Sequence, residues 1–124
     1  MGNHYQTAQE IEAVVAGFEN CTTAKEKFTH LSHLTVAAYY LRTSTPHETF
    51  AKMRFGLLRF LDHHGVGPAK YSDRVTWAWI EKIRNVIEQM DNASLVSITN
   101  AVLEKLGRYR LTVEDQHEEG AVKM

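Results

Sequence analysis

Cysteine, proline and glycine are scarce in this sequence, and each scarcity limits what the protein can be. Cys21 is the only cysteine among 124 residues, so no disulfide can form within the chain. A chain without a disulfide framework suits a reducing compartment, and we expect a cytoplasmic protein. Only two prolines and seven glycines occur, and Pro46, Gly65 and Gly107 fall where helices are expected to start or stop. A disulfide-stabilised scaffold is therefore excluded.

An excess of one charge and long hydrophobic runs are also missing. The chain has 14 basic and 15 acidic residues, for a formal net charge of −1. No basic stripe follows from this balance, so we expect no nucleic-acid partner. No apolar stretch is long enough to span a bilayer, and the first residues lack the apolar run of a signal peptide, so we expect no membrane partner. The composition, 44% hydrophobic and 23% charged, is typical of a globular domain.

Apolar residues recur at helical spacing in five segments. Thr45, Pro46 and Glu48 form the clearest start signal, as cap, first helical residue and capping-box partner. Gly65 is expected to end that helix in the left-handed conformation. The helices are predicted at about 7–19, 24–42, 46–64, 73–90 and 95–107, with Thr22 or Thr23, Thr45, Ser72 and Ser94 capping the last four.

The predicted fold class is all-α, an antiparallel bundle of four to five helices with short connections. Residues 1–107 are expected to form a single helical domain, and residues 108–124 a C-terminal tail with an acidic stretch. The helix at 24–42 is apolar nearly all round, which predicts a central position in the bundle.

Histidines are numerous, seven in all, and some fall on inward helix faces. At about 100° per residue, His30 and His33 share a side with Ala37, and His64 lies on the face of Phe60. Antiparallel neighbours would bring the start of the second helix, the end of the third and the start of the fourth to one end of the bundle. Buried polar groups without partners cost about 1–3 kcal/mol each. Their collection at one end predicts a pocket containing His30, His33, His64, Tyr71, Asp73 and Thr76.

The leading hypothesis is a protein that binds a small molecule in a pocket at this end of the bundle. The stronger version of this hypothesis is that the protein is an enzyme. A histidine would serve as base or ligand because imidazole titrates near neutral pH. Asp73 would orient a histidine or accept a bond from substrate, and Tyr71 would donate from the loop. Arg54, Thr76, Trp77 and Trp79 are expected to form the pocket wall.

Two alternatives stay open at this point. A non-catalytic protein that binds a divalent metal ion is one, with His30, His33 and His64 as ligands, since zinc is commonly held by histidines. An offset of about 9 Å between His30 and His64 along their helices, at 1.5 Å per residue, is wide for one ion. The other alternative is a helical interaction or regulatory module, monomeric or a homodimer, whose histidines are structural.

Several separated motifs resemble a family of small bacterial all-helical proteins of unassigned function. The resemblance covers about residues 18 to 80 and implies a fold and a site without naming a reaction. The family pattern continues after its tyrosine with His-Glu-Thr, where this chain has Ser72, Asp73 and Arg74. A role carried by that histidine would be lost or changed here, although Asp73 keeps a carboxylate. The matching residues are Phe28-Thr29-His30-Leu31-Ser32-His33-Leu34, Tyr40-Leu41, Met53-Arg54, Gly56-Leu57, Phe60, His64-Gly65, Tyr71 and Thr76.

Overall fold

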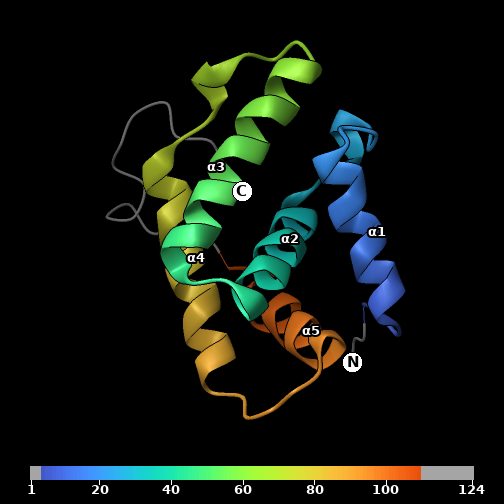
Figure 1. Cartoon of the computed structure of the whole chain (residues 1–124), viewed down its shortest axis with the longest axis vertical. Coiled ribbons are helices and arrows are strands. Elements are labelled where there is room, and N and C mark those ends of the chain that lie inside the picture. The colour runs from blue at the N-terminus through green and yellow to red at the C-terminus, as the bar shows by residue number, and fades with distance from the viewer. Residues whose placement is uncertain (1–3, 110–124) are drawn as a thin grey trace.

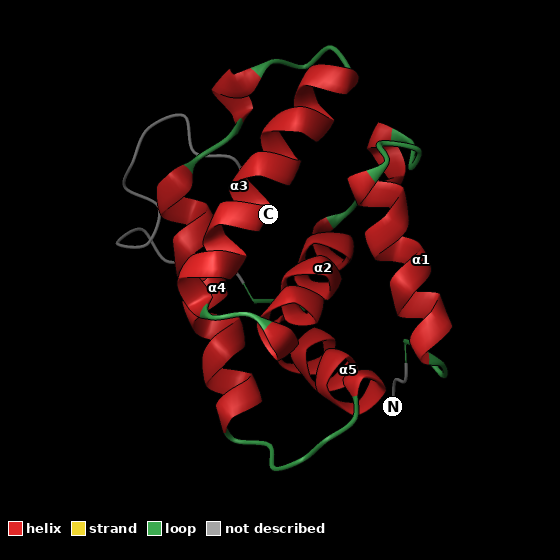
Figure 2. Cartoon of the chain, in the orientation of Figure 1, coloured by secondary structure: helices red, strands yellow, loops and turns green. Residues whose placement is uncertain are grey.

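The computed structural model describes residues 4–109, and these form helices and connecting turns without any strand (Figures 1 and 2). The predicted all-α bundle is confirmed: the helices pack against one another around one core. None of the described helices is both long and apolar enough to cross a lipid bilayer. Most of the predicted tail, residues 110–124, lies outside the described residues. The elements are α1 (Ala8–Glu19), η1 (Lys25–Lys27), α2 (His30–Thr43), α3 (Pro46–His63), η2 (Pro68–Lys70), α4 (Asp73–Glu88) and α5 (Leu95–Leu106), where η marks a 3₁₀ turn.

The predicted starts of α3, α4 and α5 are confirmed by their caps. The hydroxyls of Thr45, Ser72 and Ser94 each accept a hydrogen bond from a backbone N–H in the first turn of the helix that follows. Glu48 completes the capping box by accepting from the backbone N–H of Thr45 at 2.9 Å. Gly65 follows α3 with φ of 73°, the left-handed conformation that glycine adopts without strain.

The predicted second helix, by contrast, is broken, and its predicted caps at Thr22 or Thr23 are wrong. A 3₁₀ turn covers Lys25–Lys27, and α2 begins only at His30. Thr29 is the N-cap of α2 in extended backbone, and its N–H donates to the Ser32 hydroxyl at 3.1 Å. The break places His30 in the first turn of α2. Its cause is long-range, because the Phe28 side chain leaves the helical path and is buried in the core.

The expected central position of α2 is confirmed. This helix contacts each of the other four α-helices, and it lies in the middle of the bundle in Figure 1. Its residues 34–38 are all buried. Thr35 is the polar member of that run, and its hydroxyl donates to the Leu31 carbonyl at 2.8 Å. The core is therefore assembled around one helix whose sides are nearly all covered.

One face of α3 packs against the core, so the opposite face points outward. Its buried residues include Met53, Gly56 and Phe60. Gly56 lets α1 approach closely, because a Cβ at this position would lie 2.5 Å from the Phe18 ring. Helix α1 packs on one side of α3, and helix α4 packs on the other side (Figure 1). The remaining side of α3 faces outward.

The segment before α1 is fastened to α5 by one side chain. The backbone N–H of Tyr5 donates to Asn100 Oδ1 at 3.0 Å, and Asn100 Nδ2 donates to the Tyr5 carbonyl at 2.9 Å. Asn100→Ala removes both bonds, and we expect the free energy of unfolding to fall by about 1–2 kcal/mol. Urea denaturation measures the change, and faster amide exchange at Tyr5 should accompany it. Asn85→Ala, on the exposed side of α4, is the control and should change stability by less than about 0.5 kcal/mol. An Asn100→Ala variant as stable as this control would contradict the assignment.

Candidate functional site

His30 lies at the start of α2 and joins three helices. Its Nε2 lies 3.3 Å from the Leu106 carbonyl at the end of α5, and a carbonyl only accepts, so Nε2 carries the proton. The imidazole meets the Trp79 ring of α4 edge to face, with centroids 4.8 Å apart. Trp79 is buried in the core of the bundle. The His30 side chain points inward, as its helical position predicts. Its partners are the Leu106 carbonyl at the end of α5 and the Trp79 indole of α4.

His33 faces the aromatic core of the bundle. Its Nδ1 donates to the Thr29 carbonyl at 3.0 Å, and its ring packs on Phe28 with centroids 4.6 Å apart. Burial lowers the pKa of His33 to about 4; the Thr29 carbonyl opposes this shift and the nearby His30 adds to it. His33 is therefore neutral near pH 7, with its proton on Nδ1. A base this weak accepts few protons at neutral pH.

His64 caps α3 on the far side of the same aromatic cluster. Its ring contacts Phe60 with centroids 4.4 Å apart, and Phe60 in turn contacts Phe28 at 5.0 Å. Its buried Nε2 has no hydrogen-bond partner among the described residues. Phenylalanine rings thus lie between His33 and His64. Within residues 4–109, no group of three or more His, Cys, Asp or Glu side chains is arranged to hold a metal ion.

Tyr71, Asp73, Thr76 and Arg54 do come together, where α3 meets the start of α4. Arg54 Nε donates to Asp73 Oδ1 at 3.1 Å, in a pair whose side chains are 52% and 57% exposed. Burial raises the pKa of the Tyr71 hydroxyl, and the Asp73 carboxylate raises it further. The Tyr71 oxygen meets no partner in good hydrogen-bond geometry, although Thr76 and Asp73 are close enough to act on it. Thr76 itself donates to the Ser72 carbonyl at 2.9 Å.

The predicted site residues therefore fall into separate groups. Tyr71, Asp73 and Arg54 lie at the α3–α4 junction, His30 lies against Trp79 and α5, and His33 and His64 flank the phenylalanines. His30 and His33 are near enough to interact electrostatically. His30 and His33 contact aromatic rings of the bundle, whereas the Arg54–Asp73 pair is exposed.

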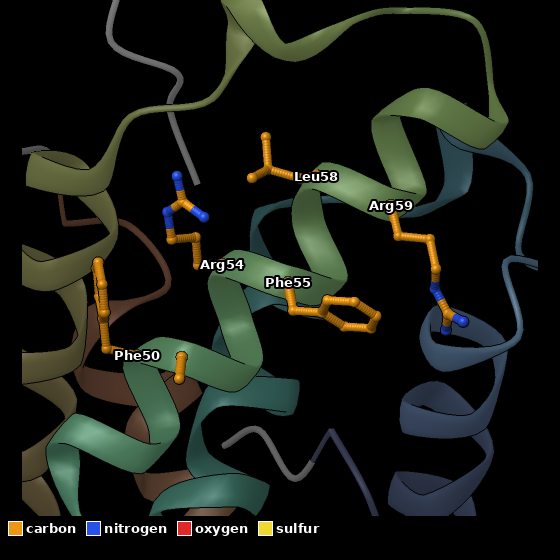
Figure 3. Close-up of a pocket in the computed structure, with 6 residues that line it drawn as sticks. Phe50, Arg54, Phe55, Leu58 and Arg59 are labelled. Carbon is orange, nitrogen blue, oxygen red and sulfur yellow. The ribbon is translucent and has the colours of Figure 1, made fainter.

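Two hollows lie side by side on the outer surface of α3 and α4, and neither is lined by His30, His33 or His64. The first, about 480 Å³, is lined within residues 4–109 by side chains of α3 and is called the α3 groove (Figure 3). The second, about 430 Å³, lies between α3 and α4 around Trp77 and is called the Trp77 cavity. Phe50 lines both. The α3 groove is lined by Phe50, Ala51, Arg54, Phe55, Leu58 and Arg59, and the Trp77 cavity by His47, Phe50, Asp73, Arg74 and Trp77.

The shape of the α3 groove follows from helical geometry. Its lining residues are spaced four apart in two rows, Phe50–Arg54–Leu58 and Ala51–Phe55–Arg59. Residues four apart form a ridge on a helix surface, and two neighbouring ridges enclose a groove. In Figure 3, Phe55 and Arg59 extend to one side of α3, and Phe50 and Arg54 to the other. The arrangement is a helix-packing surface that is open at the outside of the bundle.

Phe55 is the outstanding residue of this surface. It is 67% exposed, the largest value for a large hydrophobic side chain among the described residues. The Arg59 guanidinium lies over its ring, 5.5 Å from the centroid, in a cation–π contact. At the other hollow, the His47 ring stacks on Trp77 with centroids 5.2 Å apart and planes 25° apart. Aromatic and cationic side chains thus share one outer face.

The α3 groove was missed by the sequence prediction. Phe50 is half-buried and His47 is exposed, and neither is among the predicted site residues. The spacing of Ala51 and Phe55 on the polar side of the helix was the available signal. Periodicity alone does not separate such a row from a broad core-facing stripe.

Comparison with family models, with curated proteins and with solved structures finds no match to this chain. The resemblance noted from the sequence motifs therefore stays a prediction.

Proposed function

We propose that this chain is a helical protein-interaction module that docks a segment of a partner protein on the α3 groove. The observation that carries the proposal is the exposure of Phe55 between Arg54, Leu58 and Arg59. A phenylalanine left in water forfeits about 1.5–3 kcal/mol of burial free energy. A partner that covers the ring recovers this free energy, which gives the surface an affinity for apolar side chains.

The composition and openness of the surface favour a protein partner. Binding hot spots are rich in aromatic residues and arginine, and the α3 groove combines Phe50 and Phe55 with Arg54 and Arg59. Sites for small molecules enclose most of the ligand in a cleft, whereas this groove runs along the outside of a single helix (Figure 3). A partner segment can follow such a groove over several residues.

Phe55→Ser tests the proposal. Peptides are selected from a random display library on the full-length chain, and their affinities for the variants are then measured by fluorescence anisotropy. We expect selected peptides to bind Phe55→Ser at least about tenfold more weakly than the unchanged chain, because removal of a hot-spot side chain costs more than about 1.4 kcal/mol. Tyr109→Ser is the matched control, because Tyr109 is the other exposed large hydrophobic residue within residues 4–109, at 36%.

The affinities of the two variants decide whether Phe55 belongs to a docking surface. Peptides that bind both variants like the unchanged chain would show that Phe55 is not part of a docking surface. Circular dichroism should show that Phe55→Ser keeps its helices, since exposed substitutions usually change stability by less than about 0.5 kcal/mol.

A small-molecule function is the second candidate, and the Trp77 cavity is the observation that favours it. Trp77 there contacts His47 and Phe50, and Asp73 lines the same hollow beside Tyr71. These residues include part of the predicted His/Asp/Tyr site. A fragment screen by NMR discriminates the candidates: hits lost in Trp77→Ala and kept in Phe55→Ser would favour a ligand pocket over a docking surface.

The lone cysteine supports a cytoplasmic location under either candidate.

A further inference from the structure

We infer that the partner segment is an amphipathic α-helix with acidic side chains along its edges, an inference that rests on the proposed function. The α3 groove supplies the geometry for a helix, and its two arginines supply the charge preference. Both features come from the same six residues.

The geometry of the groove matches a helix better than a strand. The rows Phe50–Arg54–Leu58 and Ala51–Phe55–Arg59 are i±4 ridges. The complement of a groove between such ridges is an i±4 ridge of a second helix, crossing at about −50°. A strand, which places alternate side chains on opposite faces, does not present a continuous ridge. Helix-in-groove docking of this kind uses apolar residues at i, i+3, i+4 and i+7.

Ala51 provides the position for the central apolar side chain. It is the smallest residue of the groove, and it precedes Phe55 by one helical turn in the same ridge, while Phe50 begins the neighbouring ridge. Because the Ala51 side chain is small, the groove is deepest between the Phe50 and Phe55 rings. A leucine or phenylalanine of the partner would therefore be held over Ala51, with an aromatic ring on either side.

The charges of the groove select an acidic partner. Among the described residues, its lining contains two guanidinium groups and no carboxylate. Arg59 contacts the Phe55 ring, and it belongs to neither of the ion pairs found within residues 4–109, Arg54–Asp73 and Arg84–Glu88. Arg54 uses Nε for Asp73 in an exposed pair, and a guanidinium with five donors retains others for a partner carboxylate. Carboxylates at the edges of a docked helix would meet both arginines.

The same charges disfavour a second copy of the chain as the occupant. A two-fold symmetric dimer places the same patch of both subunits face to face. Contact through the α3 groove would then bring Arg54 and Arg59 of each copy toward their counterparts. Like charges brought together in this way oppose association.

The test uses two synthetic amphipathic helices of about 18 residues, or five turns. Both carry the same leucine ridge, and one has glutamate along its edges where the other has lysine. At low salt we expect the full-length chain to bind the acidic peptide at least about tenfold more tightly than the basic one, with a smaller difference at physiological salt. Arg59→Gln should weaken the acidic peptide roughly threefold to tenfold and leave the basic peptide unweakened. Arg42→Gln, an equal charge change at the exposed end of α2, is the matched control.

The outcomes separate this inference from the function on which it rests. Equal binding of both peptides, lost in Phe55→Ser, would overturn the acidic partner and keep the docking function. If neither peptide binds and the display selection also fails, the proposed function itself fails.

Two further outcomes would identify a different occupant. A dimer that Phe55→Ser dissociates would assign the groove to a second copy. Tighter peptide binding after Glu114, Asp115, Glu118 and Glu119 are replaced by their amides would assign it to the chain's own acidic segment. Each result would overturn the separate acidic helix as partner.

Discussion

Gly56→Ala is expected to lower the free energy of unfolding by about 2 kcal/mol, against the usual direction for this substitution in a helix. Alanine is favoured over glycine inside a helix by about 0.8–1.0 kcal/mol. Overpacking of a well-filled core typically costs about 1–3 kcal/mol. We expect the packing cost to exceed the helix preference here, because the added methyl group meets a ring that has little room to move.

The ring is that of Phe18 in α1. A Cβ on Gly56 would lie 2.5 Å from both Cε2 and Cζ of Phe18. Phe18 is 1% exposed and stacks on Phe28 with centroids 4.9 Å apart and planes 10° apart. Phe60 confines it on another side at 5.9 Å. Relief therefore requires α1 to move away from α3, or the whole aromatic cluster to rearrange.

A double-mutant cycle isolates this contact. Phe18→Leu removes the ring atoms that the new methyl group would meet, and it is itself destabilising because it leaves a cavity. In the Phe18→Leu background, Gly56→Ala should cost little or even stabilise the protein, which gives a coupling energy of about 2 kcal/mol. Urea denaturation of the four proteins measures it. A single Gly56→Ala variant that is more stable than the unchanged chain would show that α1 does not pack on α3 at this point.

The helix ends are the part of the fold that sequence predicts best. Thr45, Ser72 and Ser94 each bond a backbone N–H within the next turn, and Gly65 adopts its left-handed conformation next to the helix that it ends. These interactions involve residues three or four apart, so they are readable from the chain itself. The bundle class follows in turn from helices joined by short connections.

The break before α2 shows where local patterns stop being informative. Phe28 and Thr29 fit a helical pattern, yet the structure ends the 3₁₀ turn before them and starts α2 after them. Phe28 packs on Phe18 and Phe60, from two other helices. Contacts with residues so far away in sequence override helix preference, and no pattern within residues 24–42 reveals them.

The site residues illustrate the same limit. Periodicity predicted that the His30 side chain points into the bundle. The hydrogen-bond partner of His30, the Leu106 carbonyl, is 76 residues further along the chain, where periodicity cannot identify it. The Arg54–Asp73 pair spans 19 residues and joins two residues that the sequence had placed in one pocket. Helix rotation and crossing determine which inward groups meet, and both depend on core packing. The outward Phe55 was missed for a related reason, because an exposed apolar residue and a core residue look alike in the sequence.

Acidification is expected to destabilise this protein through His33. The pKa of this histidine is lowered by burial from 6.5 to about 4 in the folded chain. Below pH 6.5 the unfolded chain binds a proton that the folded chain excludes, so the free energy of unfolding falls as the pH falls. The slope approaches about 1.4 kcal/mol per pH unit and levels off near the folded pKa. Allowing for solvent near the ring, we expect a loss of about 2 kcal/mol between pH 7 and pH 4.5.

Two substitutions make this loss specific to His33. His33→Gln keeps an N–H that can donate to the Thr29 carbonyl and removes the titrating ring, so its stability should fall less steeply with acid than that of the unchanged chain. His30→Gln removes a neighbouring side chain whose electrostatic effect lowers the pKa of His33. In that variant the pKa of His33 should rise and its share of the acid loss should shrink.

Urea denaturation in half-unit pH steps gives the slopes, and the NMR shift of the His33 ring gives its pKa directly. A midpoint near 6.5, or equal slopes for His33→Gln and the unchanged chain, would mean that water reaches this imidazole freely. The result also bears on function, because a histidine with a pKa of about 4 is a poor general base at neutral pH. Confirmation would assign His33 to the aromatic core, and the search for binding chemistry would move to the outer face of α3 and α4.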